Sequence, residues 1–192
     1  MVTGILGGSF DPPHEGHLTI TQLFLTKSRR ELSDLGVRFI GRAGEIADGA
    51  RSVRWVPANE HRLKRVATPF ATRLHLCRLA LSSLHSSAVA LDAIEYEQPS
   101  AGKSLLMLEK VKEKTGDTVV MLMGDDNYQS REQWYRFEEI ESRFGVVVFP
   151  RRDQWLGSVR KLSSSALRAD VTTSGLSPEG ARYIEQSPEI YN

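Results

Sequence analysis

Two histidines near the start of the chain have the spacing and the neighbours for chemistry on phosphate groups. His14 and His17 lie three residues apart, so they share one face of a helix that begins near Gly16. The preceding Gly7 and Gly8 let the backbone turn sharply and approach a ligand without a side chain in the way. A helix N-terminus presents backbone N–H groups and the positive end of the helix dipole, to which two imidazoles would add. The segment therefore predicts a phosphate-binding site.

Two simpler interpretations of the same residues stay open at this point. A turn made by Gly7 and Gly8 is common in proteins that bind nothing there. His14 and His17 are also of a type that binds metal ions, but a zinc site would need a third and usually a fourth ligand. No cysteine or further histidine lies in this part of the chain, and we predict no metal held by protein ligands.

A second candidate for phosphate chemistry is a serine-rich segment near the end of the chain. Ser163 and Ser164 can cap a helix, and their hydroxyl and N–H groups can hold phosphate oxygens. Arg168 follows one turn beyond Ser164, where its guanidinium can neutralise charge on a polyphosphate. The alternative is an ordinary capped helix whose arginine lies in solvent.

The elements that would position these residues alternate between short apolar strands and helices. Strands are predicted at 2–6, 37–40, 52–56, 88–94, 118–123 and 145–149. Helices are predicted at 16–27, from a cap at Thr68 through Leu84, at 103–114 and at 134–142, with further helix starts at Ser164 and Pro178. The stretch 29–51 is otherwise predicted to be a loop. This alternation indicates an α/β protein with a doubly wound parallel sheet, in which ligands bind at the carboxyl ends of the strands.

The composition sets limits on the class of protein. A chain of 192 residues with a formal charge of +1 suits one globular domain over residues 1–192, with no reason to expect nucleic-acid or membrane binding. Cys77 is the only cysteine, which excludes an intrachain disulfide and suits a buried position in a reduced compartment. No signal peptide or membrane-spanning run is recognised, so a soluble cytoplasmic protein is expected. The sequence does not give the oligomeric state and leaves a homo-oligomer open.

The string from Gly7 to His17 resembles the GG(T/S)FDPxHxGH signature of the bacterial nicotinate mononucleotide adenylyltransferases, a branch of the HxGH nucleotidyltransferase superfamily. The resemblance implies a Rossmann-like nucleotidyltransferase fold. It also implies transfer of the adenylyl group of ATP to nicotinate mononucleotide with Mg²⁺, giving deamido-NAD and pyrophosphate in NAD biosynthesis. In such a protein His14 and His17 would contact the ATP phosphates as catalytic residues. The other residues of the string that it assigns to ATP binding are Gly7, Gly8, Ser9, Phe10 and Gly16.

Three later segments extend the resemblance along the chain. The string LSSSALR resembles the family motif ISSTxIR and implies ATP contacts for Ser163 and Ser164 and a catalytic role for Arg168. The stretch from Gly124 to Ile140 resembles GxDxxxxxxxWxxWxEI. It implies ATP contacts for Gly124 and for Asp126, which could bind the ribose or base or help to hold a metal, or could be only a turn residue. Trp134 would either stack on the acceptor base or pack under the sheet. A strand that ends at Arg151 matches a family strand near the nucleotide.

The acceptor side of the motif set departs from the family pattern. Lys64 falls at the position of a family lysine, but the usual neighbouring histidine is Leu63. The family string PSYTxDTL reads PSAGKSLL here, so that Ala101, Gly102 and Ser104 replace tyrosine, threonine and aspartate. We assign Lys64, Ser104 and Trp134 to acceptor binding. The departures leave two alternatives: an adenylyltransferase for nicotinamide mononucleotide or phosphopantetheine, and a nucleotide-binding relative without turnover.

Overall fold

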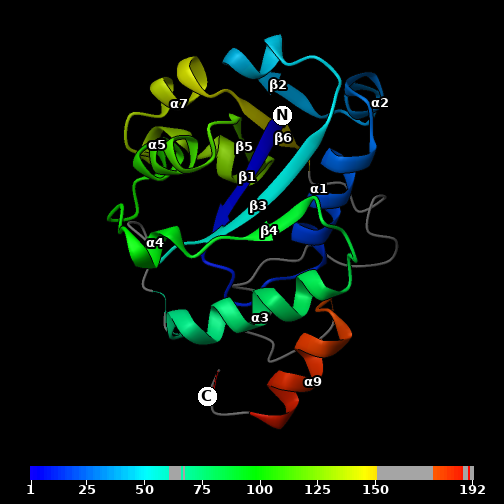
Figure 1. Cartoon of the computed structure of the whole chain (residues 1–192), viewed down its shortest axis with the longest axis vertical. Helices are drawn as coiled ribbons and strands as arrows, with labels where there is room; N and C mark the ends of the chain where they lie inside the picture. Colours follow the sequence, from blue (N-terminus) through cyan, green and yellow to red (C-terminus); the bar gives the residue numbers. More distant parts are fainter. Residues whose placement is uncertain (61–65, 67, 151–174, 188–189, 191–192) are drawn as a thin grey trace.

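A single mixed sheet forms the centre of the protein. The computed structural model describes residues 1–60, 66, 68–150, 175–187 and 190, and Figure 1 shows their arrangement. Its six strands lie in the order β2-β6-β5-β1-β3-β4. They span β1 Val2–Gly8, β2 Arg38–Ile40, β3 Arg51–Pro57, β4 Val89–Leu91, β5 Thr118–Gly124 and β6 Val146–Phe149. All neighbouring strands are parallel except β2, which pairs antiparallel with β6 at one edge.

Helices cover both faces of this sheet. Those described are α1 Glu15–Thr26, α2 Arg29–Asp34, α3 Phe70–Ser82, α4 Ile94–Glu97, α5 Ser104–Thr115, α6 Asp125–Gln129, α7 Phe137–Arg143 and α9 Pro178–Gln186, with 3-10 turns η1 Gly41–Glu45 and η2 Arg131–Gln133. Figure 1 shows α5 and α7 on one side of the sheet and α1 and α2 on the other. The prediction of a doubly wound α/β fold is therefore confirmed, with an antiparallel edge strand added.

Alternating side chains of the strands build a separate hydrophobic core on each face. In β5, Val119 and Met121 join the core under α5 and α7, while Val120 and Leu122 join the core under α1 and α3. Both cores are almost fully shielded from solvent, which explains why the strand reads as a continuous apolar run. Cys77 lies in the second core, as predicted, and burial raises the pKa of its thiol. Within the part of the chain that the structure describes, no helix is long and apolar enough to cross a membrane.

The stretch 29–51 was predicted as a loop around a short strand, and that prediction is wrong for its first part. Ser28 caps α2 by accepting the N–H of Glu31, and the Glu31 carboxylate accepts the N–H of Ser28 in return. The backbone N–H and the hydroxyl of Ser28 and the amine of Lys27 all donate to the Glu31 carboxylate and lower its pKa from 4.5 to about 2. The serine and the glutamate three residues later form a capping box, a signal that is visible in the sequence.

Three element boundaries also differ from the prediction. The strand expected at 88–94 ends at Leu91, because Asp92 accepts the N–H of Ile94 and turns the chain into α4. Helix α3 is capped at Pro69 and Thr68 provides no side-chain cap. The helix expected from Trp134 begins only at Phe137, after Arg136 with a positive φ of 51°. The helix start predicted at Pro178 is confirmed, and the one at Ser164 lies outside the described residues.

A buried hydrogen bond joins α1 to β3 across the second core. The Trp55 indole Nε1 donates to Thr21 Oγ1 at 2.8 Å, and that hydroxyl donates to the backbone oxygen of His17 at 2.9 Å. Both Trp55 and Thr21 have no exposed surface. The position of His17 is thus tied to the sheet by a polar contact inside the core.

Replacing Thr21 by valine should lower the free energy of unfolding by about 1–3 kcal/mol, because the shape is kept while the buried indole N–H loses its acceptor. Urea unfolding followed by tryptophan fluorescence measures the change. Thr26→Val is the matched control, since the exposed Thr26 makes the same kind of bond to the oxygen of Gln22 at 2.8 Å. The control should change stability by less than about 0.5 kcal/mol. Equal effects of the two substitutions would contradict the account.

Candidate functional site

The two histidines cap helix α1 with each other's help. His14 is the N-cap residue, and its Nδ1 accepts the N–H of Gly16 at 3.2 Å. In return the backbone N–H of His14 donates to His17 Nδ1 at 3.1 Å. The ring centroids lie 3.9 Å apart with the planes tilted by 34°, so the imidazoles are in close contact at the start of the helix. The sequence prediction placed both on one helical turn, and the structure brings them together there.

This pattern of acceptors fixes the form of both imidazoles. A ring nitrogen that accepts an N–H bond carries no proton, so each neutral ring holds its proton on Nε2. Protonation of either Nδ1 would turn an acceptor into a donor and break the cap. The helix end therefore places its dipole and two imidazole Nε2–H groups together, which suits phosphate oxygens. The backbone N–H groups of Glu15, Gly16 and His17 already donate within the protein, to the Gly175 oxygen, His14 Nδ1 and the His14 oxygen.

The side chain of Phe10 packs between His17 and Trp55 of the core. Its ring stacks on Trp55 at 4.9 Å and lies 4.7 Å from His17, and only 1% of the residue is exposed. The assignment of Phe10 to ATP binding can therefore apply to its backbone only, because the ring belongs to the core. A positive φ of 48° at Phe10 turns the chain away from β1 towards α1.

A buried arginine holds the loop after β1 against the loop after β3. The Arg73 guanidinium donates to the backbone oxygens of Ser9 at 2.7 Å and Ala58 at 2.8 Å. Its Nε donates to the oxygen of Thr68 at 3.0 Å, and the residue is 1% exposed. One cation thus joins Ser9 in the loop after β1 to Ala58 after β3 and to Thr68 just before α3, which fixes the path of the loop after β1.

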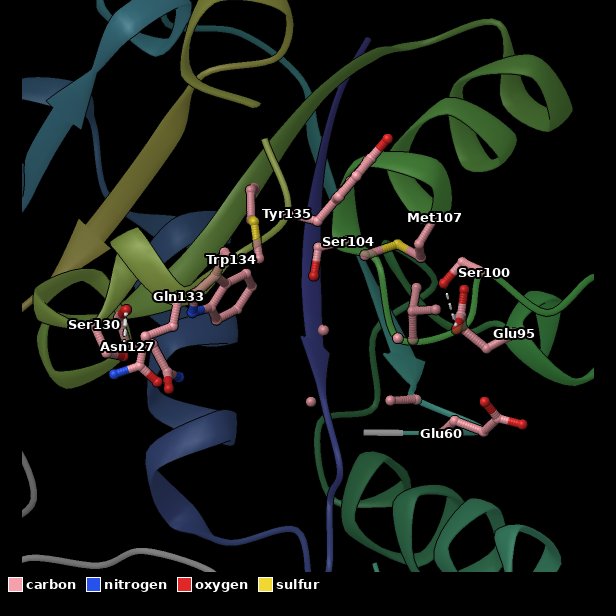
Figure 2. Close-up of a pocket in the computed structure, with 16 residues that line it drawn as sticks. Glu60, Glu95, Ser100, Ser104, Met107, Asn127, Ser130, Gln133, Trp134 and Tyr135 are labelled. Carbon is pink, nitrogen blue, oxygen red and sulfur yellow. Dashed lines mark hydrogen bonds between the residues drawn. The ribbon is translucent and has the colours of Figure 1, made fainter. Parts of the chain in front are cut away.

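A cavity opens at the carboxyl ends of β1, β3 and β5, and Figure 2 shows its lining. It holds about 810 Å³ of empty space, part of which is open to solvent. Trp134 and Ser104, both assigned to acceptor binding, lie in its wall together with Gly7 and Gly8. Trp134 also contacts Phe137 edge to face at 5.9 Å, so it both lines the cavity and packs against the first residue of α7. The remaining wall residues include Glu60, Glu95, Ser100, Met107 and Tyr135.

Glu95 is the wall residue that the sequence analysis missed. Its carboxylate accepts the hydroxyl of Ser100 at 2.8 Å and is 3% exposed. Burial raises the pKa of Glu95 above its ordinary value of 4.5. The predicted strand 88–94 continues past the observed end of β4 at Leu91. Glu95 therefore directly follows the predicted strand, whereas in the structure it lies in the helix that follows β4. An earlier strand end at Asp92 would have directed attention to Glu95.

Gly124 and Asp126, both assigned to ATP binding, lie next to each other at the end of β5. A Cβ placed on Gly124 would lie 2.7 Å from Asp126 Oδ1, so the carboxylate folds back over the glycine backbone. Asp126 lies in the first turn of α6. Five assigned residues fall outside the described part of the chain: Lys64, Arg151, Ser163, Ser164 and Arg168. Their roles remain sequence predictions.

Comparison with known proteins places this fold and these motifs in context. No family model matches the chain. It is 34% identical over 152 residues to a protein of Rhodopirellula baltica described as a probable nicotinate-nucleotide adenylyltransferase, with 77% of this chain and 60% of that protein covered. The chain therefore spans less than two thirds of that relative's length. A Chlorobaculum tepidum protein of the same description is 30% identical over 156 residues, with 80% of this chain and 70% of that protein covered.

A solved structure supports the fold assignment. The nicotinic acid mononucleotide adenylyltransferase of Plasmodium falciparum complexed with NaAD matches with a TM-score of 0.68 at 18% identity. The alignment covers 100% of this chain and 98% of that one. The prediction of a Rossmann-like nucleotidyltransferase fold is confirmed.

Replacing Arg73 by methionine should lower the free energy of unfolding by about 3 kcal/mol or more, because it leaves several buried carbonyl groups without a donor. Chemical denaturation measures this loss. Arg78→Met on the exposed side of the same helix is the control and should be nearly neutral. If both substitutions cost the same, Arg73 does not hold the loops as described.

Proposed function

Because the chain belongs to the nicotinate-nucleotide adenylyltransferase family, we propose that it transfers the adenylyl group of ATP to nicotinate mononucleotide. The products are deamido-NAD and pyrophosphate, so the reaction is a step of NAD biosynthesis. The proposal treats residues 1–192 as one nucleotidyltransferase domain acting in the cytoplasm, with the two nucleotides as its partners. The Plasmodium structure contains NaAD, a dinucleotide of the kind that this reaction forms.

One observation carries the proposal. Gly7 and Gly8 line the cavity on one side and lead directly into the histidine-capped helix on the other. A mononucleotide in the cavity would therefore have its phosphate beside a polyphosphate held at the start of α1. In-line phosphoryl and nucleotidyl transfer depends mainly on this kind of positioning and on charge neutralisation.

The described residues can perform the charge neutralisation in the following way. An oxygen of the acceptor phosphate attacks the α-phosphorus of ATP, a new P–O bond forms, and the bond to the bridging oxygen of the β-phosphate breaks. The Nε2–H groups of His14 and His17 donate to the phosphate oxygens as charge moves onto the leaving pyrophosphate, and the positive end of the α1 dipole adds to this stabilisation. The proposal adds Arg168, Ser163 and Ser164 to this site from their motif alone.

Mg²⁺ is expected to accompany ATP and to neutralise charge on its phosphates. The ion keeps several waters and commonly takes one or two carboxylates beside substrate phosphates, so it needs no protein cage. Within the described ranges no group of three or more histidine, cysteine or acidic residues could hold a metal ion. Asp126 at the end of β5 is the carboxylate that we propose for this contact, which suits an ion shared with the substrate.

The acceptor can be identified by a direct assay. Purified protein is incubated with ATP, Mg²⁺ and one of nicotinate mononucleotide, nicotinamide mononucleotide or phosphopantetheine, and pyrophosphate release is followed. We expect release with nicotinate mononucleotide and a product with the mass of deamido-NAD. Faster turnover of another acceptor would overturn the choice of substrate. ATP binding without turnover of any of the three would favour the relative without activity.

The two functions of His14 can be separated by substitution. His14→Asn should keep the helix cap, since asparagine is a good N-cap residue, and should lower kcat/KM about 10²-fold through loss of the Nε2–H donor. His14→Ala should lose activity and also about 1 kcal/mol of stability. Pyrophosphate assays and thermal unfolding measure both effects.

His85→Asn is the control for these variants, since His85 is exposed and lies outside the site. Its positive φ of 44° is a conformation that asparagine adopts readily. The control should keep the rate and the stability of the wild type. A wild-type rate in His14→Asn would remove this histidine from the catalytic site.

A further inference from the structure

Glu95 lines the acceptor cavity, and its side chain is buried, which is unusual for a carboxylate. It belongs to the short helix α4, which follows the carboxyl end of β4, and only 3% of it is exposed. Figure 2 shows it on the opposite side of the β1 strand end from Trp134, with Ser100 beside it. A flat base that occupies the cavity next to Trp134 would have Glu95 on its far side.

Its two oxygens have different surroundings. Oε2 accepts the hydroxyl of Ser100 at 2.8 Å. Oε1 is buried and has no hydrogen-bond partner. A buried carboxylate oxygen without a donor is costly, and a proton on Oε1 removes that cost. In this state Oε1 is an O–H donor in the wall of a cavity.

Burial, and not the charges around Glu95, favours the neutral form. It is the largest influence and raises the pKa of Glu95. The hydroxyl of Ser100, the Lys110 amine on α5 and the backbone N–H of Ser100 lower this pKa, and the exposed Glu60 raises it with the smallest effect of the five. The Lys110 amine, however, donates to the backbone oxygens of Gln98 and Pro99.

The other cations on the elements packed against α4 are engaged elsewhere. Arg54 on β3 and Lys114 on α5 both bind Asp92, at 3.1 and 2.8 Å. Lys114 also lies 4.0 Å from Glu97. The acidic partner in each of these ion pairs is Asp92 or Glu97 and not Glu95.

The turn at Ala101 and Gly102, next to Ser100, lacks side-chain hydrogen-bond donors. Ala101 and Gly102 stand where the family has tyrosine and threonine, so they bring no side-chain hydroxyl to the acceptor base. Both have a positive φ, 53° and 67°, in the turn that leads into α5. Gly102 lines the cavity together with Ser100 and Glu95. A side-chain donor to a carboxylate on the base would therefore come from another residue of this wall.

Building on the proposed function, we propose that Glu95 recognises the carboxylate of the acceptor base by donating a hydrogen bond from its neutral carboxyl group. The bound pair then consists of a carboxylic acid and a carboxylate that share one proton. Specificity for nicotinate over nicotinamide follows from this pair only while Glu95 is protonated. Above the raised pKa of Glu95 two negative charges would face each other and the preference would fall.

The test compares kcat/KM for nicotinate mononucleotide and nicotinamide mononucleotide across the full pH range in which the protein stays folded. Both acceptors carry the same phosphate, whose titration cancels in the ratio of the two values. In the wild type the ratio should fall about 10- to 100-fold as pH rises, the size expected for loss of one hydrogen bond to a charged group. Glu95→Gln keeps an N–H donor at every pH, so its ratio should be independent of pH.

Glu60→Gln is the matched control, because it removes a negative charge from the same cavity at an exposed position. Its ratio should still fall with pH, with the midpoint moved to lower pH because Glu60 raises the pKa of Glu95. A flat ratio in the wild type would overturn the proposal, as would a Glu95→Gln profile identical to that of the wild type. Absence of turnover with nicotinate mononucleotide at any pH would instead overturn the proposed function.

A measurement on the wild type keeps the proposal testable if Glu95→Gln does not fold. Calorimetric titrations at a pH above the Glu95 transition, in buffers with different heats of ionisation, give the protons taken up on binding. Nicotinate mononucleotide should take up about one proton more than nicotinamide mononucleotide, because its carboxylate restores the proton on Glu95. Equal uptake for the two would contradict the proposal.

Discussion

The reciprocal cap between His14 and His17 is the interaction on which the phosphate site depends. Each Nδ1 accepts a backbone N–H at the start of α1, so rotation of either ring would break a hydrogen bond of the helix cap. The Nε2 donors are therefore held in place by secondary structure. Phe10 and Trp55 support the rings from the core, and Thr21 connects the same helix to β3. Catalysis by charge neutralisation benefits from donors that need no reorganisation during the reaction.

The sheet brings the second half of the site to the same place. Parallel strands end at one edge, so the glycines that close β1 lie between the helix end and the acceptor cavity. Arg73 holds the loops after β1 and β3 at a fixed separation through the oxygens of Ser9 and Ala58. An in-line reaction needs its two substrates held in a fixed relative orientation. The hydrogen bonds of Arg73 hold the loops after β1 and β3, which both substrates would contact.

Much of this arrangement was predictable from the sequence, for physical reasons. Buried parallel strands give continuous apolar runs, which made the sheet predictable. The string from Gly7 to His17 follows the first of these strands, which made the phosphate site predictable. The predictions failed where a local polar contact overrode the apolar pattern. Ser28 and Glu31 form α2 by capping each other, and Asp92 ends β4 early by accepting the N–H of Ile94. The second failure hid Glu95, since its role depends on burial, which no local pattern of the sequence reveals.

The central claim is that ATP phosphates and the acceptor base occupy adjoining sites at the end of β1. A crystal structure with nicotinate mononucleotide and a non-hydrolysable ATP analogue tests it most directly. We expect the triphosphate within hydrogen-bond distance of Nε2 of His14 and His17, and the base in the cavity between Trp134 and Glu95. A triphosphate bound away from α1, or a base outside that cavity, would contradict the account.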